Sequence, residues 1–390
     1  MKDEIIESDT PDLGAIRRIV IKVGTRVISR ADGRLAQSRL LAIVEAAVAL
    51  KQDGPRARDV LLVSSGAVGL GRGALGLEET PAELAPRQAC AAVGQGLLMG
   101  LYEAGFGRLG TTCGQVLLTE GDFDDRGRYL KTRAMLGALL AHGAVPVINE
   151  DDAVTAEKLG AVAENDRPVF SENDRLAALI ASKLDADLLV LLTHVDGLYD
   201  RDPRLFADAS LVYRVDSAAQ ERELLAAADG TPGDGGRGGM RSKAEAASLA
   251  ARSGCHALIA SGHDPGAIER FLEGEAVGTW FPARGRLAAR RRWIAFAAAP
   301  RGIVHLDAGA VAALRERARS LLPVGVREVE GDFSAGDIVE LRGPGGALVG
   351  RGIIGHDAET TRLWCRGRPP AELRSGHALI RRDDLVLEES

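Results

Sequence analysis

Short apolar segments, each followed by a segment of helical periodicity, recur along the first two thirds of the chain. The apolar segments are Arg18–Val23, Asp59–Val63, Ala144–Asn149, Asp187–Leu192 and His256–Ala260. Most of them do not alternate apolar and polar residues, a pattern typical of strands buried on both faces of a parallel sheet. After the first of them, Leu40, Val44 and Val48 recur at helical spacing. The order of strand and helix predicts an α/β fold, an open αβα sandwich with a mainly parallel sheet.

The pattern changes near residue 282. The segment "RGRLAARRRW", from Arg284 to Trp293, holds five arginines and no acidic residue, which is typical of a solvated connector. Beyond it, "GDFSAGDIVEL" and "GALVGRGII" predict short strands joined by glycine turns, and one helix precedes them. We therefore expect an α/β domain at residues 1–281, an Arg-rich linker at 282–300 and a small domain of β-barrel type at 301–386.

The composition narrows the class of protein. The 390 residues are 46% hydrophobic and 27% charged, which excludes a mainly disordered chain, and the net charge of −6 gives no overall basic field for nucleic acid. No apolar run approaches the ~20 residues that span a bilayer, and the acidic N-terminus lacks the apolar core of a signal peptide. Four widely spaced cysteines predict reduced thiols, and no spacing of metal ligands is present. We expect a cytoplasmic protein that contacts no membrane.

Polar residues follow four of the predicted strands, at the point where each strand ends. They are Lys22–Thr25, Ser64–Gly66, Asn149–Asp152 and Thr193–Gly197. In open α/β sheets, ligands bind beyond the carboxyl ends of the strands. We expect these segments to form a binding site at that edge of the sheet.

Two of these segments have a simpler interpretation as well. A lone lysine such as Lys22 commonly extends from a strand end into water, whereas the adjacent Gly24 would let a phosphate or carboxylate approach the backbone. The segment "VSSGAVGLGRG", from Val63 to Gly73, offers backbone N–H groups to an anion. Its glycines fit tight helix packing equally well, so both interpretations stay open.

Two acidic segments flank one excursion of the chain. The first, "PVINEDDAV", ends a strand in an asparagine and three acids, and the second, "FSENDRLAALIA", opens a helix with Glu172, Asn173 and Asp174. Helix capping alone would explain Asn173 or Asp174. Two acidic clusters together are harder to explain in that way, because like charges repel unless cations or ligands intervene.

The segment "GGRGGMRSK", from Gly235 to Lys243, places four glycines around one arginine. The residues after it predict a helix from Met240 to Arg252 with Gly254 as its C-terminal cap. The order Ser-Lys excludes the phosphate loop GxxxxGK[ST]. Lys243 falls in the first helical turn, where a cation is unfavourable unless an anion is bound. We therefore favour a phosphate-binding loop over a flexible linker.

Taken in order, these motifs resemble the amino acid kinase family over nearly the whole chain, and the C-terminal region resembles a PUA domain. The motifs are "VIKVGTRVI", "VSSGAVGLG", "ACAAVGQGLLMGLY", "VPVINEDDAV", "LLTHVDGLYDRDP" and "GGMRSKAEAA". Within the family, the chain is most similar to the members that phosphorylate free L-glutamate. The resemblance implies transfer of a phosphoryl group from ATP to the γ-carboxylate, giving L-glutamyl 5-phosphate in the first step of proline biosynthesis. Mg²⁺ would enter with ATP.

The resemblance also implies roles for particular residues. Lys22 and Lys243 would be catalytic cations beside the transferred phosphoryl group, and Asp174 would organise them. The implied substrate-binding residues are Ser65, Asp152 and Asn173. The implied ATP-binding residues are Lys22, Thr193, His194, Arg237, Gly238, Gly239, Met240, Arg241, Ser242 and Lys243. The γ-carboxylate, with a pKa of about 4.3, is ionised at neutral pH, so no general base is required.

Four residues depart from the family pattern: Arg26, Arg175, His194 and Arg237 stand where a small or hydroxyl-bearing residue, asparagine, aspartate and threonine are usual. The catalytic set departs nowhere from that pattern, so we expect an active enzyme. The resemblance further implies a homo-oligomer, feedback inhibition by proline and handover of the labile product to a glutamyl phosphate reductase.

Two alternatives remain open. The nearer one is a kinase of the same family with a different acceptor, such as N-acetylglutamate, aspartate, carbamate or UMP. The other is an RNA-binding protein with a vestigial kinase half, in which Arg284 to Arg301 contact phosphates. The negative net charge and the aromatic content of 4% disfavour RNA binding, because few side chains can stack on bases.

Overall fold

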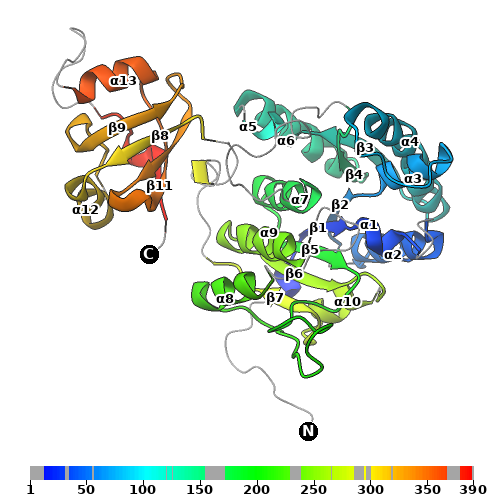
Figure 1. Cartoon of the computed structure of the whole chain (residues 1–390). Helices are drawn as coiled ribbons and strands as arrows, with labels where there is room; N and C mark the ends of the chain where they lie inside the picture. The colour runs from blue at the N-terminus through cyan, green and yellow to red at the C-terminus, as the bar shows by residue number, and fades with distance from the viewer. Residues whose placement is uncertain are drawn as a thin grey trace. The chain divides into compact units, whose positions relative to one another are not determined.

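The computed structural model describes residues 13–30, 35–54, 57–119, 121–124, 126–153, 172–228, 239–264, 266–284, 294–295, 300–317, 319–366 and 378–388. The chain divides into two compact units (Figure 1). The first comprises residues 1–122 and 129–286, and the second comprises 123–128 and 287–390. Most of the predicted linker, 282–300, lies outside the described residues, so the domain limits stay a prediction.

The first unit contains a sheet of seven strands in the order β3-β4-β2-β1-β5-β6-β7. These strands are β1 (Arg18–Val23), β2 (Asp59–Ser64), β3 (Cys113–Leu118), β4 (Val145–Glu150), β5 (Leu188–Thr193), β6 (His256–Ser261) and β7 (Thr279–Phe281). All neighbouring pairs are parallel except β6 and β7. The predicted α/β class with a mainly parallel sheet is confirmed.

Helices cover both faces of this sheet (Figure 1). They are α1 (Thr25–Ile28), α2 (Gln37–Lys51), α3 (Ala67–Ala74), α4 (Leu84–Arg108), α5 (Gly121–Asp124), α6 (Arg126–Ala141), α7 (Glu172–Lys183), α8 (Ala218–Ala228), α9 (Met240–Arg252) and α10 (Ala267–Leu272). Ile19, Ile21 and Val23 of β1 belong to a buried cluster with residues of α2 and α4. Since side chains alternate along a strand, Lys22 faces the other layer, where α7 packs against β1 and α9.

The sequence predicts the buried strands better than the edge strand β3. The prediction for β1 matches the observed bounds, those for β2 and β6 end one residue early, and those for β4 and β5 are shifted by one residue at both ends. No strand was predicted at β3, which pairs with one neighbour only and keeps Leu117 exposed. An edge strand with one solvated face lacks the continuous apolar run that marks the inner strands.

The glycines between β2 and α4 serve close packing of helices. Gly66 precedes α3 with a φ of 112°, a backbone conformation that favours glycine. A Cβ atom at Gly71 would lie 1.8 Å from the Cys90 carbonyl oxygen, and one at Gly94 would lie 1.7 Å from the Ala67 carbonyl oxygen. The packing interpretation therefore holds at Gly71 and Gly94, where α3 and α4 touch backbone to backbone.

Gly94→Ala is expected to lower the free energy of unfolding by about 3 kcal/mol or more, because backbone atoms of α3 would have to move. Gly96→Ala is the matched control on the same helix, since nothing lies within 4 Å of a Cβ atom there. That control should gain up to ~1 kcal/mol from helix propensity. Urea denaturation measures both variants, and equal stability of the two would contradict the packing argument.

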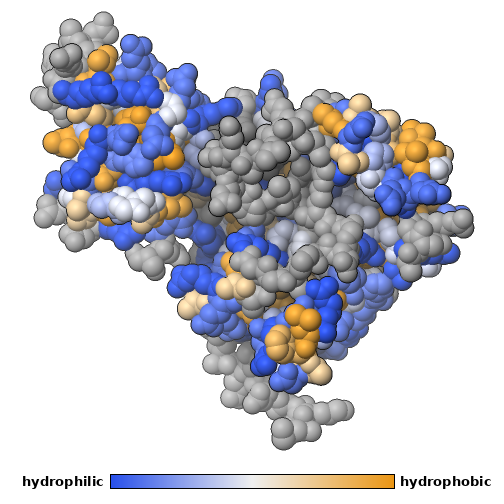
Figure 2. Space-filling model, in the orientation of Figure 1, coloured by the Kyte–Doolittle hydropathy of each residue, from blue (hydrophilic) through white to orange (hydrophobic). Residues whose placement is uncertain are grey.

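Exposed apolar side chains gather over α3 and α4 (Figure 2). The exposed residues of these helices and of the turn after α3 include Leu75, Leu77, Val93 and Leu97. Val93 and Leu97 are four residues apart on α4 and lie on one side of it, whereas Leu98 and Tyr102 are buried. The apolar residues of α4 are thus divided between the core and the surface.

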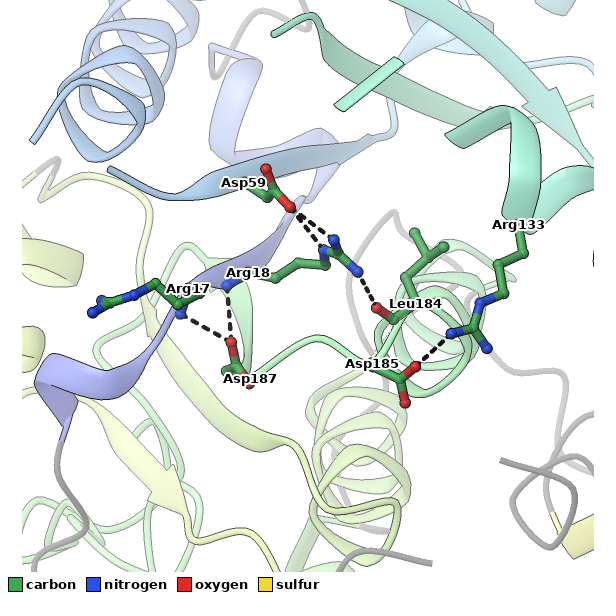
Figure 3. Close-up of polar contacts among 7 residues, drawn as sticks. All are labelled: Arg17, Arg18, Asp59, Arg133, Leu184, Asp185 and Asp187. Carbon is green, nitrogen blue, oxygen red and sulfur yellow. Dashed lines mark hydrogen bonds and ion pairs between the residues drawn. The ribbon is translucent and has the colours of Figure 1, made fainter. Parts of the chain in front are cut away.

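Hydrogen bonds of Arg17 and Arg18 connect the amino ends of the central strands, at the edge of the sheet opposite the predicted site (Figure 3). The Arg18 guanidinium donates to Asp59 at the start of β2, with 2.8 Å between Nη2 and Oδ2, and to the Leu184 carbonyl oxygen after α7. The backbone N–H groups of Arg17 and Arg18 both donate to Asp187 Oδ2 over 2.9 Å. These contacts fix the register of β1 against the connection from α7 to β5.

The second unit has its own sheet of five strands, in the order β12-β11-β10-β8-β9. The strands are β8 (Gly302–Leu306), β9 (Val326–Gly331), β10 (Ile338–Arg342), β11 (Leu348–Ile353) and β12 (Leu385–Leu387). Two helices, α12 (Ala308–Arg317) and α13 (Ala358–Cys365), accompany them. The early helix and the two strands predicted from the glycine-bounded segments are present, and α13 was not predicted. The side chain of Asp357 caps α13 by accepting from the Thr360 backbone N–H.

Candidate functional site

The polar segments singled out in the sequence meet at the carboxyl edge of the parallel sheet. Val23, the last residue of β1, pairs with Ser64 at the end of β2 and with Leu192 near the end of β5. The end of β4, at Glu150, belongs to the same edge of the sheet. The shared register therefore brings together residues that are far apart in the sequence.

Two lysines share one carboxylate at this edge. Lys22 Nζ lies 2.6 Å from Asp174 Oδ1, and Lys243 Nζ lies 3.3 Å from Asp174 Oδ2. The hydroxyl of Ser242 donates to Asp174 Oδ2 over 2.8 Å. Asp174 is fully buried, and Lys22 and Lys243 are 2% and 8% exposed. Since the described contacts pair two cations with one anion, the cluster keeps one positive charge in excess.

The helices α7 and α9 position this cluster. Asp174 lies in the first turn of α7, where a carboxylate is stabilised by the helix dipole. Ser242 and Lys243 lie in the first turn of α9, which begins at Met240 as the sequence predicts. A lysine is unfavourable there, and the anion that offsets it in this structure is Asp174. Asp174 therefore supplies part of the negative charge that we expected a bound ligand to provide at Lys243.

The charges perturb the pKa values of the cluster. Burial raises the pKa of the Asp174 carboxyl, but attraction to Lys22 and Lys243 more than offsets this, and the pKa falls to about 2. Burial lowers the pKa of Lys22, Asp174 opposes that effect, and the repulsion from Lys243 adds to it. An anion that approached the two lysines would stabilise their charged forms.

The acid stability of the protein should depend on Asp174. Its pKa is about 2 in the folded chain against an ordinary value of 3.8, so folding favours the ionised carboxyl. The corresponding stability is fully present above about pH 4 and is lost as the pH falls towards 2, and it amounts to about 2–3 kcal/mol. Urea denaturation between pH 5 and pH 2 should show a shallower pH dependence in Asp174→Asn than in the unchanged chain. Identical pH dependence would contradict this assignment.

A second group of side chains lies on the β2–β4 side of the edge and forms a chain of hydrogen bonds. Asn173 Nδ2 donates to Ser65 Oγ and to Asn149 Oδ1, each over 3.0 Å. Asn149 Nδ2 donates in turn to Gln95 Oε1 of α4 over 2.8 Å. The Oδ1 atom of Asn173 is buried and accepts no hydrogen bond from any residue that the structure describes. The structure thus brings Ser65 and Asn173 together, while Asp152 lies in the turn that follows β4.

On the opposite side of β1, Thr193 ends β5 and His194 follows it. Thr193 is buried at the end of that strand, and its carbonyl oxygen accepts from the Gly262 N–H. His194 is exposed, with its Nε2 atom 3.5 Å from Arg26 Nη1. Partial burial lowers the pKa of His194, and repulsion from Arg26 and Lys243 lowers it further. The imidazole is therefore largely uncharged at neutral pH, unlike the aspartate usual at this position.

The glycine-rich loop is described only from Gly239 onward. Gly239 is extended and precedes α9, whose residue Met240 is half-buried. The Arg241 guanidinium donates to Glu245 Oε1 over 2.9 Å, one helical turn later. Arg237 and Gly238 lie outside the described residues. Of the residues predicted in this loop, Ser242 and Lys243 are those whose described contacts reach the charged cluster.

The described part of the chain contains no group of three or more metal-ligating side chains that could hold an ion. Both oxygens of Asp174 are engaged by lysines, so its carboxylate is not free for a cation. Within the same described residues, no helix has the length and apolarity needed to cross a membrane.

Comparison with known proteins identifies the family. The sequence profile of the Amino acid kinase family matches residues 17–261. The chain belongs to the amino acid kinase family. The profile of the PUA domain matches residues 302–369, which include most of the second unit's sheet. This amino acid kinase therefore carries a separate C-terminal PUA domain.

Several relatives match this amino acid kinase over nearly its full length. A glutamate 5-kinase of Thioalkalivibrio sulfidiphilus is 44% identical over 96% of this chain and 98% of its own. A glutamate 5-kinase of Gloeobacter violaceus is 45% identical over 91% of this chain and 93% of its own. Among solved structures, a UMP kinase of Bacillus anthracis covers 70% of this chain and 98% of its own at 16% identity, with a TM-score of 0.47.

Sequence patterns assign no role to two residues of the candidate site. The sequence marks Asn149 as a polar strand end, and Gln95 lies in one of the motifs that carry the family resemblance. Gln95 is a polar residue in the otherwise apolar segment "ACAAVGQGLLMGLY", next to the Gly94 contact with α3. The single amide within this apolar segment is the signal that could identify it, since a half-buried amide requires a partner.

Proposed function

We propose that this chain transfers the γ-phosphoryl group of ATP to the γ-carboxylate of L-glutamate, giving L-glutamyl 5-phosphate and ADP. This is the first step of proline biosynthesis. The full-length similarity to glutamate 5-kinases supports the substrate, and the unbalanced positive charge at Lys22, Asp174 and Lys243 supports the chemistry. That charge is the observation that carries the proposal.

The reaction needs positioning and charge neutralisation rather than proton abstraction. The γ-carboxylate of glutamate, with an ordinary pKa of about 4.3, is already a nucleophile at neutral pH. The obstacle is to bring this anion against an anionic triphosphate. Two lysines within 3.3 Å of one carboxylate provide cations whose positions are fixed before the substrates arrive. Preorganised charges of this kind stabilise the charge of the transferred group without reorganisation.

Each catalytic side chain has a distinct part in this proposal. Lys22, from the central strand β1, and Lys243, from α9, contact the transferred phosphoryl group. Asp174 holds the two ammonium groups at a fixed separation and limits their mutual repulsion. Its low pKa, about 2, keeps it ionised throughout the physiological pH range, so it does not act as an acid or base.

The nucleotide lies on the β5–β6 side of β1 in this proposal. Thr193, His194 and the residues from Arg237 to Lys243 contact ATP there, and the N-terminus of α9 faces its phosphates. Mg²⁺ carried by the nucleotide would neutralise part of the phosphate charge. The described residues fit this arrangement because they offer lysines to phosphates and no carboxylate cluster to a cation. Glutamate lies on the other side, near Ser65, Asp152 and Asn173.

Release of ADP with a panel of acceptors tests the function. Turnover should be observed with L-glutamate and be at least about 100-fold lower with N-acetylglutamate, aspartate, carbamate or UMP, since a misplaced carboxylate loses alignment. Turnover with one of the other acceptors alone would overturn the glutamate assignment. The family resemblance further predicts feedback inhibition by proline, a glutamyl phosphate reductase partner and a homo-oligomer. The cytoplasmic location stays a prediction from the composition, and RNA binding by the PUA domain stays an open alternative.

A further inference from the structure

The amide chain at the glutamate side has a defined direction. The backbone N–H of Glu150 donates to Asn149 Oδ1 over 2.9 Å. A backbone N–H can only donate, so the atom of Asn149 that faces it must be the oxygen. The Nδ2 atom of Asn149 therefore faces Gln95, and Gln95 must present its oxygen in return. One backbone group thus sets the orientation of two side-chain amides.

The same logic sets the orientation of Asn173. Its Nδ2 atom must face Asn149 Oδ1, and the same Nδ2 atom donates to Ser65 Oγ. Its Oδ1 atom is left buried, with no hydrogen-bond partner in the described part of the chain. A buried acceptor without a hydrogen bond destabilises the unliganded protein. A ligand that supplies a donor at this point recovers that energy.

We infer that Gln95 is a positioning residue which, through Asn149, holds Asn173 Oδ1 as an acceptor for the α-ammonium group of the amino-acid substrate. This inference rests on the proposed function. The two carboxylates of glutamate can only accept hydrogen bonds near neutral pH, so the ammonium group is its sole strong donor. Gln95 contacts no substrate in this arrangement.

Gln95 acts by satisfying Asn149, which is 2% exposed. Without the Gln95 oxygen, Asn149 Nδ2 would be a buried donor without an acceptor, and the side chain would gain by leaving its place. Asn173 would then lose one of the two acceptors that orient it. The phosphoryl-transfer cluster at Asp174 does not depend on Gln95, so the loss should affect glutamate binding and spare the chemical step.

Gln95→Met removes the acceptor and keeps the length of the side chain, and Gln95→Glu keeps an acceptor. Steady-state kinetics should show a KM for glutamate raised about 10-fold in Gln95→Met, with kcat and the KM for ATP within about twofold. Gln95→Glu should retain a KM close to that of the unchanged enzyme. Gln88→Met, two turns earlier on α4, is the matched control and should change nothing. Unchanged glutamate KM in Gln95→Met, or equal impairment in Gln95→Glu, would overturn the inference.

Glutarate, which lacks the ammonium group, gives a readout that does not depend on any variant folding. Calorimetry on the unchanged enzyme should show glutarate binding at least about 10-fold more weakly than glutamate, and Gln95→Met should reduce this ratio. Equal binding of the two ligands by the unchanged enzyme would refute the ammonium contact. Failure of the unchanged enzyme to phosphorylate glutamate would instead refute the proposed function.

Discussion

Lys243→Ala should lower kcat about 1,000-fold while the KM for glutamate changes by less than about threefold, because its charge matters most when the phosphoryl group is in transfer. Lys243 Nζ lies 3.3 Å from Asp174 Oδ2 at the start of α9, and the residue is only 8% exposed. Steady-state ADP release gives both constants. A kcat within tenfold of the unchanged enzyme would remove Lys243 from the catalytic set.

Two controls separate the charge of Lys243 from its packing. Lys243→Met keeps most of the apolar side chain and should lose turnover as fully as Lys243→Ala. Lys51→Ala removes a lysine at the end of α2, which lies beside Gly143 ahead of β4 and therefore at the opposite edge of the sheet. That variant should keep normal kinetics. Recovery of turnover in Lys243→Met would show that the charge is not required.

Asp174→Asn should be the most damaging single change, lowering both kcat and stability. It leaves Lys22 and Lys243 facing each other without an anion, and loss of one member of a buried ion pair costs about 3–5 kcal/mol. We expect kcat to fall by about 1,000-fold or more, because the two ammonium groups lose their fixed separation. Urea denaturation and ADP release measure the two effects.

A double variant distinguishes the structural role of Asp174 from its catalytic role. Lys22→Met together with Asp174→Asn removes the 2.6 Å ion pair altogether, and replacement of a buried pair by neutral groups is often close to neutral in stability. The double variant should therefore regain most of the lost stability and remain inactive. If it regained activity as well, the cluster would be a structural ion pair only.

The sequence was sufficient for the fold class because the inner strands are continuous apolar runs. It also located the edge at which the site lies, since Lys22, Ser65, Asn149 and Thr193 each come at a strand end. The identity of the catalytic set came from the family resemblance, and its roles remain proposals. Spacing along the chain could not reveal that Asp174 joins two lysines, because Lys243 lies 69 residues away from it.

Gln95 shows the limit of sequence patterns most clearly. Its partner, Asn149, is 54 residues away and belongs to a different layer of the fold. The direction of the hydrogen bonds depends on a backbone N–H at Glu150, and no composition or periodicity encodes that. The packing of α3 against α4 at Gly71 is similar, since the glycines from Val63 to Gly73 would equally suit an anion-binding turn.

The strand order of the sheet divides the chain at β1. Strands β2, β3 and β4, from the first half of the chain, lie on one side of it, and β5, β6 and β7, from the second half, lie on the other. Under the proposed function, acceptor and nucleotide are bound by separate, contiguous lengths of polypeptide. Recombination within the connection between α7 and β5 could therefore exchange the acceptor-binding segment of one kinase for that of another. Such a hybrid must preserve the pairing of β1 with β5 and the contact of α7 with α9.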